Sequence, residues 1–168
     1  MELNWMGKNR YFVERLIKFG NLYATIYNKE HYYGTDVKIS FAQIQVVEYL
    51  LENEELNQNM SMIAERLGIS SSNFTKLVQK LEAKELLKKY NTEENKKNII
   101  IRVTDTGRSV YKVYSEFIVK HYFAEIFDIT AEIPPEYILL FAKILDVQIK
   151  TDKVSPEEKA VNLVPIQK

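Results

Sequence analysis

The sequence of 168 residues contains no cysteine, only five glycines and only four prolines. The lack of cysteine excludes a disulfide framework, a thiolate metal site and any sensing of oxidants through a thiolate. All four prolines lie at or beyond Pro134, so the residues before them contain few helix breakers and are expected to be mainly helical. No two glycines lie within ten residues of each other, which excludes a glycine-rich phosphate loop.

Long apolar runs are also missing. The longest extends from Tyr137 to Ala142, whereas a membrane-spanning helix needs ~20 apolar residues. The N-terminal segment has no apolar core of the kind that secretory signals contain. We therefore expect a cytoplasmic protein without a membrane partner. At ~150 residues per domain the length predicts one domain with extensions, and 46% hydrophobic residues supply enough apolar mass for a packed core.

Neither charge is in excess over the whole chain, which has 23 basic and 23 acidic residues. The charges are nevertheless unevenly distributed. Residues 61–110 contain ten basic and six acidic side chains, a net charge of +4, and the remainder carries −4. A local basic stripe is typical of a phosphate-binding surface, although a solvated helical face is the alternative explanation for the lysines alone.

Two helices are predicted in the first 60 residues. Apolar residues spaced by four and three positions indicate a helix that ends near Gly34. These residues are Phe12, Leu16, Phe19, Tyr23 and Ile26. Ser40 and Gln43 have the spacing of a capping box and open a second helix, which ends in the acidic, asparagine-rich residues 52–59.

Residues 60–86 show the pattern of a helix-turn-helix motif. Ile63, Ala64 and Leu67 indicate the buried side of a short helix, and Gly68 ends it by supplying a left-handed turn. Ser70 caps the next helix, whose buried face is expected to contain Phe74, Leu77, Val78 and Leu81. The free face carries small polar and basic residues suited to base edges and phosphates. A helical hairpin with a merely polar face is the alternative interpretation.

A β-hairpin is predicted directly after this motif. Leu86–Tyr90 and Asn98–Thr104 have the pattern of two strands, and the second alternates with Ile99, Ile101 and Val103 inward. The polar loop between the strands carries two lysines within reach of DNA beside the preceding helix. A solvated turn is the alternative. Thr104 is expected to cap a following helix.

Four groups of residues in this region carry a resemblance to a known family. They are Ser40-Phe-Ala-Gln43, Ile63-Ala64 with Leu67-Gly68-Ile69, Ser71-Ser-Asn-Phe-Thr75 with Leu77 and Leu81, and Val103-Thr104 with Gly107. With them the sequence resembles the MarR family of winged-helix transcription regulators over residues 8–148. The resemblance implies an obligate homodimer, joined by its first and last helices, that binds pseudo-palindromic double-stranded operator DNA. It further implies a repressor released by a small aromatic or lipophilic effector.

The sequence departs from the family pattern at two places. The family's Asp and Arg at the wing tip correspond to Asn95 and Lys97, and Lys fits a narrow minor groove less well than Arg does. The usual Gly before the first strand corresponds to Glu85, so the left-handed turn at this position is an open question. No cysteine aligns with the peroxide-sensing subgroup, which excludes that branch.

Two further helices are predicted after the wing. One runs from Asp105 to about Phe127, and the last begins at Pro134 and Pro135, where proline is tolerated. Helices at both ends of the chain are too apolar to be buried by one small winged domain, so burial against a second copy is expected. A monomeric helical core is the alternative.

The predicted fold is mainly α, a winged helix-turn-helix with a two-stranded β wing flanked by N- and C-terminal dimerisation helices. The predicted segments are an N-terminal dimerisation helix in residues 1–38, a DNA-binding lobe in 39–104, C-terminal dimerisation helices in 105–150 and an extension in 151–168.

Three sets of candidate site residues follow from this interpretation. DNA contacts are expected from Ser71, Ser72, Asn73, Thr75, Lys76, Gln79, Lys80, Asn95, Lys96 and Lys97. The dimer interface is expected to include Phe12, Leu16, Tyr137, Phe141 and Ile144. The walls of an effector site are expected at Tyr11, Arg15, Phe19, Phe41, Gln45, Tyr111 and Tyr114, where Arg15 can pair with an anionic aromatic acid. A packed core without a cavity is the alternative for this last region.

No pattern in the sequence predicts catalysis, a metal site or a cofactor. His31 and His121 lack further ligands at a metal-binding spacing, and there is no G-x-S-x-G elbow. Two functions of different classes remain open. The first is a dimeric, ligand-responsive transcription regulator, favoured by the +4 segment. The second is a winged-helix module that binds protein without sequence-specific DNA binding, which Glu93 and Glu94 beside the wing tip keep open.

Overall fold

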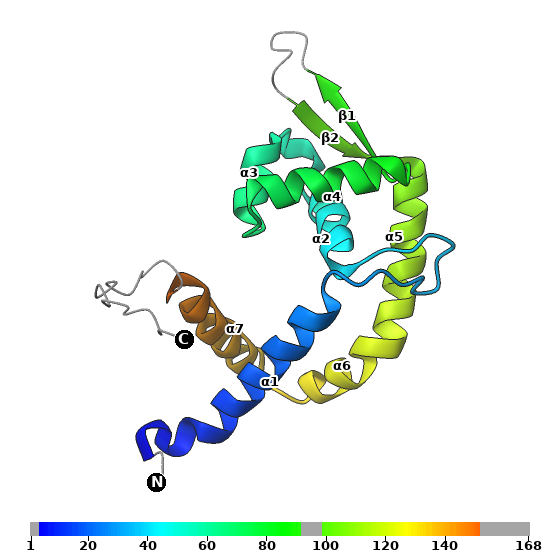
Figure 1. Ribbon diagram of the computed structural model, residues 1–168. Coiled ribbons are helices and arrows are strands. Elements are labelled where there is room, and N and C mark those ends of the chain that lie inside the picture. The colour runs from blue at the N-terminus through cyan, green and yellow to red at the C-terminus, as the bar shows by residue number, and fades with distance from the viewer. Residues whose placement is uncertain (1–3, 92–98, 152–168) are drawn as a thin grey trace, which may run out of the picture. The chain divides into compact units, whose positions relative to one another are not determined.

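The computed structural model describes residues 4–91 and 99–151 (Figure 1). The chain forms two compact units, Met1–His121 and Tyr122–Lys168. In order along the chain, the first unit contains η1 (Asn4–Asn9), α1 (Arg10–Ile26), α2 (Phe41–Glu52), η2 (Glu54–Leu56), α3 (Met60–Arg66), α4 (Ser71–Ala83), β1 (Leu87–Asn91), β2 (Ile99–Val103) and α5 (Asp105–Ile118). None of the described helices has both the length and the hydrophobicity needed to span a membrane.

The first helix ends earlier than the sequence predicts. It ends at Ile26, and residues 27–40, called the connector below, lead to α2. His31 and Ile39 pair as an antiparallel bridge that closes the connector into a loop. Tyr33 and Gly34 form its bend with φ of 44° and 78°. The predicted end near Gly34 is therefore wrong, because this glycine serves a turn in the connector.

The second helix begins as predicted. The Ser40 hydroxyl accepts from the Gln43 N–H and Gln43 Oε1 accepts from the Ser40 N–H, so both halves of the capping box are present. Ile44 and Val47 are buried in the core and Leu51 is half-buried.

The helix-turn-helix is formed by α3 and α4, and Figure 1 shows α4 lying across α2. Helix α3 ends in a Schellman turn, with the Gly68 N–H donating to the Glu65 carbonyl at 3.1 Å and the Ile69 N–H to the Ala64 carbonyl at 2.9 Å. Gly68 has φ of 65°, as expected. Ala64 is buried where the helices approach each other.

Helix α4 ends in a second Schellman turn, built on a glutamate. The Glu85 N–H donates to the Glu82 carbonyl at 2.8 Å and the Leu86 N–H to the Leu81 carbonyl at 2.9 Å. Glu85 has φ of 59°, so the left-handed turn is present without a glycine. Leu81 and Leu86 are both fully buried and provide the apolar contact that usually accompanies this turn.

The hairpin β1–β2 is antiparallel, with pairs from Leu87 with Val103 to Asn91 with Ile99. Ile101 and Val103 are buried as predicted, but Ile99 is only half-buried and Ile100 is 6% exposed. The predicted alternation is wrong at these two positions. Asn59, just before α3, pairs with Ile100 as a bridge and supplies cover on the side expected to face solvent.

Helix α5 begins at the predicted cap, where the Thr104 hydroxyl accepts from the Gly107 N–H at 3.0 Å. A Cβ on Gly107 would lie 2.3 Å from the Leu86 carbonyl oxygen, so this close approach to the α4–β1 turn requires glycine. The expected single helix to Phe127 is wrong in detail, because a π-helical segment, Val119–Phe123, follows α5.

The second unit contains α6 (Ala124–Ala131) and α7 (Pro135–Thr151). Pro135 is the first residue of α7, as predicted. None of the side chains described in this unit is buried. Large apolar side chains are exposed on both helices, among them Ile126 and Phe127 on α6 and Tyr137, Leu139 and Ile144 on α7.

We predict that Glu85→Gly stabilises the protein. The left-handed conformation costs an L-residue about 1–2 kcal/mol, and the greater freedom of glycine in the unfolded chain cancels about 0.5–1 kcal/mol of the gain. The free energy of unfolding in urea should therefore rise by up to about 1.5 kcal/mol. Gly68→Ala, at the equivalent position of α3, is the matched control and should lower it by a similar amount. A lower stability for Glu85→Gly would contradict the turn described here.

Candidate nucleic-acid interface

The outer face of α4 is the candidate interface. Phe74, Val78 and Leu81 on its inner side are almost completely buried, which fixes the rotation of the helix about its own axis. The side chains opposite them are exposed: Ser71, Ser72, Asn73, Thr75, Lys76, Gln79 and Lys80. The fold thus brings the predicted residues of this helix together on one surface.

The polar groups on this face differ in how far they are already engaged. The Ser70 hydroxyl accepts from the Asn73 N–H as the N-cap, and Thr75 Oγ1 donates to the Ser71 carbonyl at 2.8 Å. Within the part of the chain that the structure describes, the side-chain amides of Asn73 and Gln79 make no hydrogen bond; only the backbone N–H of Asn73 does, to Ser70. These two amides present both a donor and an acceptor, which is the combination that recognises a base edge.

The basic residues of the 61–110 segment fall into two groups. Lys89 pairs with Glu82 at 2.5 Å, Lys84 with Glu30 at 3.0 Å and Arg108 with Glu54 at 2.6 Å. By contrast, Lys76 and Lys80 form no ion pair with any described residue. The positive charge available on α4 is therefore centred on these two residues.

The wing tip carries three of the predicted contacts, Asn95, Lys96 and Lys97, which lie outside the described residues. At the base of the hairpin, Lys88 Nζ lies 5.7 Å from the centre of the Tyr90 ring. Arg102 donates to Asn57 Oδ1, which links β2 to the turn before α3. A pocket of about 330 Å³ is lined by Asn57, Tyr90, Ile100 and Arg102.

The aromatic residues predicted to line an effector site form a chain of ring contacts. Phe19 stacks on Tyr23 with 5.9 Å between ring centroids, and Tyr23 lies 6.2 Å from Phe41. Tyr11 and Arg15 contact each other nearer the start of α1, and a rise of 1.5 Å per residue places them about 12 Å and about 6 Å from Phe19 along the helix axis. Both of these side chains are exposed.

Tyr111 and Tyr114 on α5 are already engaged with the protein. The Tyr111 hydroxyl donates to Glu48 Oε1 at 2.7 Å. Partial burial, with the hydrogen bond and charge of Glu48, raises the pKa of Tyr111 to about 12. Burial also raises the pKa of Tyr114, whose ring packs edge-on against Tyr33 at 5.7 Å. Both phenols are therefore neutral at physiological pH.

A pocket of about 370 Å³ lies between the end of α1, the helix α2 and the α3–α4 turn. It is lined by Tyr23, Tyr27, Gln45, Leu67, Gly68, Ile69, Ser70 and Asn73. Gln45 belongs to the predicted effector set, whereas Tyr27, whose hydroxyl donates to Gln45 Oε1 at 2.5 Å, was not predicted. A second pocket of about 250 Å³ shares Tyr27, Ile69 and Asn73 and also includes Lys76 and Lys80.

Residues 37–97 match a family model described as the MarR family. The helix-turn-helix segment of the chain is therefore similar to the MarR family of transcription regulators. This segment contains the helix-turn-helix and the outer face of α4.

Two curated proteins of Bacillus subtilis are each similar to a little under half of the chain. The HTH-type transcriptional regulator YfiV is 26% identical over 76 residues, which is 45% of this chain and 48% of YfiV. The HTH-type transcriptional regulator PchR is 25% identical over 81 residues, 48% of this chain and 47% of PchR. The chain thus spans about half the length of the curated relatives it matches.

Solved structures of regulators share the fold. The PcaV regulator of Streptomyces coelicolor, in complex with its natural ligand, has a TM-score of 0.62 at 16% identity and covers 91% of this chain and 99% of its own. FabT of Streptococcus pneumoniae, in complex with DNA, has a TM-score of 0.61 at 17% identity over 87% and 98% of the two chains. At such identities the likeness shows a mainly helical winged fold and nothing beyond it.

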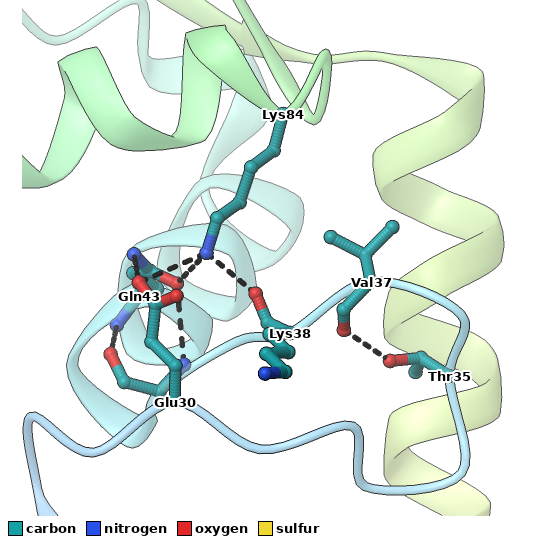
Figure 2. A network of polar contacts seen from close by, with 7 residues as sticks. Glu30, Thr35, Val37, Lys38, Gln43 and Lys84 are labelled. Carbon is teal, nitrogen blue, oxygen red and sulfur yellow. Dashed lines mark hydrogen bonds and ion pairs between the residues drawn. The ribbon is translucent and has the colours of Figure 1, made fainter.

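Sequence reasoning missed the role of three polar residues in this part of the chain. Figure 2 shows Glu30, Gln43 and Lys84 in one network, although the sequence suggests only a cap for Gln43 and a basic stripe for Lys84. A signal was present in the position of Lys84, at the end of α4, where a cation is favoured. Glu30 gave no signal in the sequence, because its proximity to Gln43 and Lys84 depends on the loop closed by His31 and Ile39.

Proposed function

We propose that this protein is a dimeric, sequence-specific DNA-binding transcription regulator of the MarR family, a repressor whose operator complex is released by a small aromatic or lipophilic effector. The observation that supports DNA binding is the chemistry of the outer face of α4. It combines amide groups without intramolecular partners among the described residues with the unpaired charges of Lys76 and Lys80. In this proposal α4 enters the major groove and the wing contacts the backbone beside it.

The dimer is proposed from the apolar surface of the first and last helices. Phe12 and Leu16 are only half-buried, and no side chain of α1 is fully buried. On α7, Tyr137, Phe141 and Ile144 are 61%, 49% and 39% exposed. Apolar surface of this extent marks an interaction site, and an obligate dimer buries ~2,000 Å² or more in total. The two α4 helices of such a dimer would lie about 34 Å apart, one turn of DNA.

We predict a dimer at micromolar concentration by light scattering. Tyr137→Glu should give a monomer, because a charge on this apolar surface cannot be buried in an interface without a partner. Met62→Glu is the matched control, since Met62 is 51% exposed but lies on α3, and should leave the dimer intact. A monomeric wild-type protein would overturn both the dimer and the operator spacing.

We also predict a division of roles on α4. Asn73→Ala and Gln79→Ala should relax sequence preference, at a cost of about 1–3 kcal/mol for each base that is no longer recognised. Lys76→Ala should weaken binding to all duplexes alike and reduce the log–log salt slope by ~0.9 for each phosphate that is no longer neutralised. Selection from a random duplex library, followed by titrations at several salt concentrations, measures both. Unchanged preference in the Asn73 and Gln79 variants would show that α4 does not read bases.

The effector is proposed to bind beside the joint between α1 and the lobe. The pocket lined by Tyr23, Tyr27 and Gln45 offers ring surfaces and polar groups to an aromatic acid. Its wall includes Asn73, so a bound ligand and DNA would compete for the same side chain. The predicted walls at Tyr11, Arg15, Phe19, Tyr111 and Tyr114 stay a prediction, with Arg15 as the partner of a carboxylate.

We predict that a salicylate-like acid weakens the complex with the selected duplex, and that DNA weakens the acid by the same factor. A tenfold effect corresponds to ~1.4 kcal/mol of coupling between the two sites. Calorimetry with the free and the DNA-bound protein measures it, with Gln45→Leu to locate the pocket and Arg15→Leu to test the alternative wall. Equal affinity of the acid for both states would exclude this mechanism.

A further inference from the structure

Lys84 is surrounded by acceptors at the end of α4. Its ammonium donates to the Lys38 carbonyl at 2.5 Å and to Gln43 Oε1 at 3.0 Å, and it pairs with Glu30 Oε1 at 3.0 Å (Figure 2). An ammonium has three N–H donors, so all of them are used within the protein. The Lys84 side chain is also only 20% exposed. A residue that belongs to the basic stripe in the sequence is thus directed inward by the fold.

Gln43 is the centre of this arrangement and is 1% exposed. Its Oε1 accepts from the Ser40 N–H at 3.2 Å as well as from Lys84, and its Nε2 donates to Glu30 Oε1 at 2.7 Å. The Ser40 N–H and the Lys84 ammonium lie on one side of the Gln43 amide and the Glu30 carboxylate on the other, which determines its orientation. In a flipped amide the Nε2 group would face two donors and Oε1 would face the carboxylate. One buried side chain therefore caps α2 and binds both members of the ion pair.

The connector supplies the remaining members. The bridge between His31 and Ile39 has N–H to carbonyl distances of 3.0 and 2.9 Å and holds the two ends of the loop together. Glu30 and Lys38 flank this bridge, which places the Glu30 carboxylate and the Lys38 carbonyl next to the start of α2. Glu30 also lies only a few residues beyond the end of α1. The network thus joins the end of α4 to the segment that leaves α1.

We propose that Glu30, Gln43 and Lys84 form a polar clamp that fixes the C-terminal end of α4 relative to the connector, and that Lys84 is a positioning residue for DNA recognition and not a phosphate contact. This inference rests on the proposed DNA binding by α4. Apolar packing of Phe74, Val78 and Leu81 allows small shifts at little cost, whereas directed hydrogen bonds permit one arrangement. Hydrogen bonds to base edges require one position of α4 on the DNA, whereas non-specific contacts to phosphates can form from several positions of the helix.

The test compares Lys84→Met with Lys80→Met, the same substitution one turn earlier on an exposed and unpaired lysine. Methionine keeps the apolar stem of the lysine and removes the ammonium. The probes are a duplex selected by the wild-type protein from a random library and a random duplex of equal length. Affinity for each is measured over a range of salt concentrations.

For Lys84→Met we expect about a tenfold loss of affinity for the selected duplex, little change for the random duplex and an unchanged log–log salt slope. For Lys80→Met we expect weaker binding of both duplexes and a slope reduced by ~0.9 for each phosphate that Lys80 neutralises in the wild type. Glu30→Gln added to Lys84→Met should cause no further loss, because both changes open the same clamp. A merely structural role of Lys84 would instead lower the folded fraction and weaken both duplexes equally.

Hydrogen exchange of the free protein tests the clamp without DNA. The amides of Glu85, Leu86 and Ile39 should exchange faster in Lys84→Met and remain as in the wild type in Lys80→Met. Unchanged exchange, or a reduced salt slope for Lys84→Met, would overturn the proposal. If the wild-type protein itself selects no duplex, the proposed function fails, whereas faster exchange confined to Lys84→Met would still establish the clamp as a feature of the fold.

Discussion

The burial of one side of α4 is the constraint on which the rest of the structure depends. Phe74, Val78 and Leu81 are at most 1% exposed, and each contributes about 2 kcal/mol by leaving water. Rotation of the helix about its axis would expose this stripe and bury the charges of Lys76 or Lys80, and both changes are costly. The core therefore determines which side of α4 faces outward, and the proposed polar clamp at the end of the helix acts only on the small shifts that remain.

The backbone at the two ends of α4 carries this constraint to its neighbours. The Schellman turn at Gly68 ends α3 just before α4, and the Schellman turn at Glu85 ends α4 just before β1. Both connections are therefore short and hydrogen-bonded. The Thr104 N–H donates to the Leu86 carbonyl at 3.1 Å, and the Thr104 hydroxyl donates to the Glu85 carbonyl at 2.7 Å. Strand β2 and the start of α5 are thereby attached to the same turn, and the absence of a side chain at Gly107 permits this contact.

Most of the lobe could be predicted because its signals are local. The caps at Ser40, Ser70 and Thr104 and the stripe on α4 each depend on residues within one or two turns of each other. The failures involve partners distant in the chain. The end of α1 depends on the pairing of His31 with Ile39. The burial of Ile100 depends on its bridge to Asn59, and the direction of the Lys84 side chain depends on its ion pair with Glu30. In the candidate site, the free face of α4 was predictable, whereas the pocket beside Tyr27 required the packing of α1 against the lobe.

The pairing of charges explains how a chain without net charge can present a positive surface. Glu30, Glu54 and Glu82 each neutralise a basic residue at about 3 Å or less, far below the screening length of ~8 Å in physiological salt. Such pairs act on a distant phosphate as weak dipoles, so the ten basic residues of the sequence overstate the electrostatic footprint. Among the described residues the unpaired charges of α4, Lys76 and Lys80, lie beside Asn73 and Gln79. In the proposed function, long-range attraction of a polyanion and hydrogen bonding to base edges therefore use the same face of one helix.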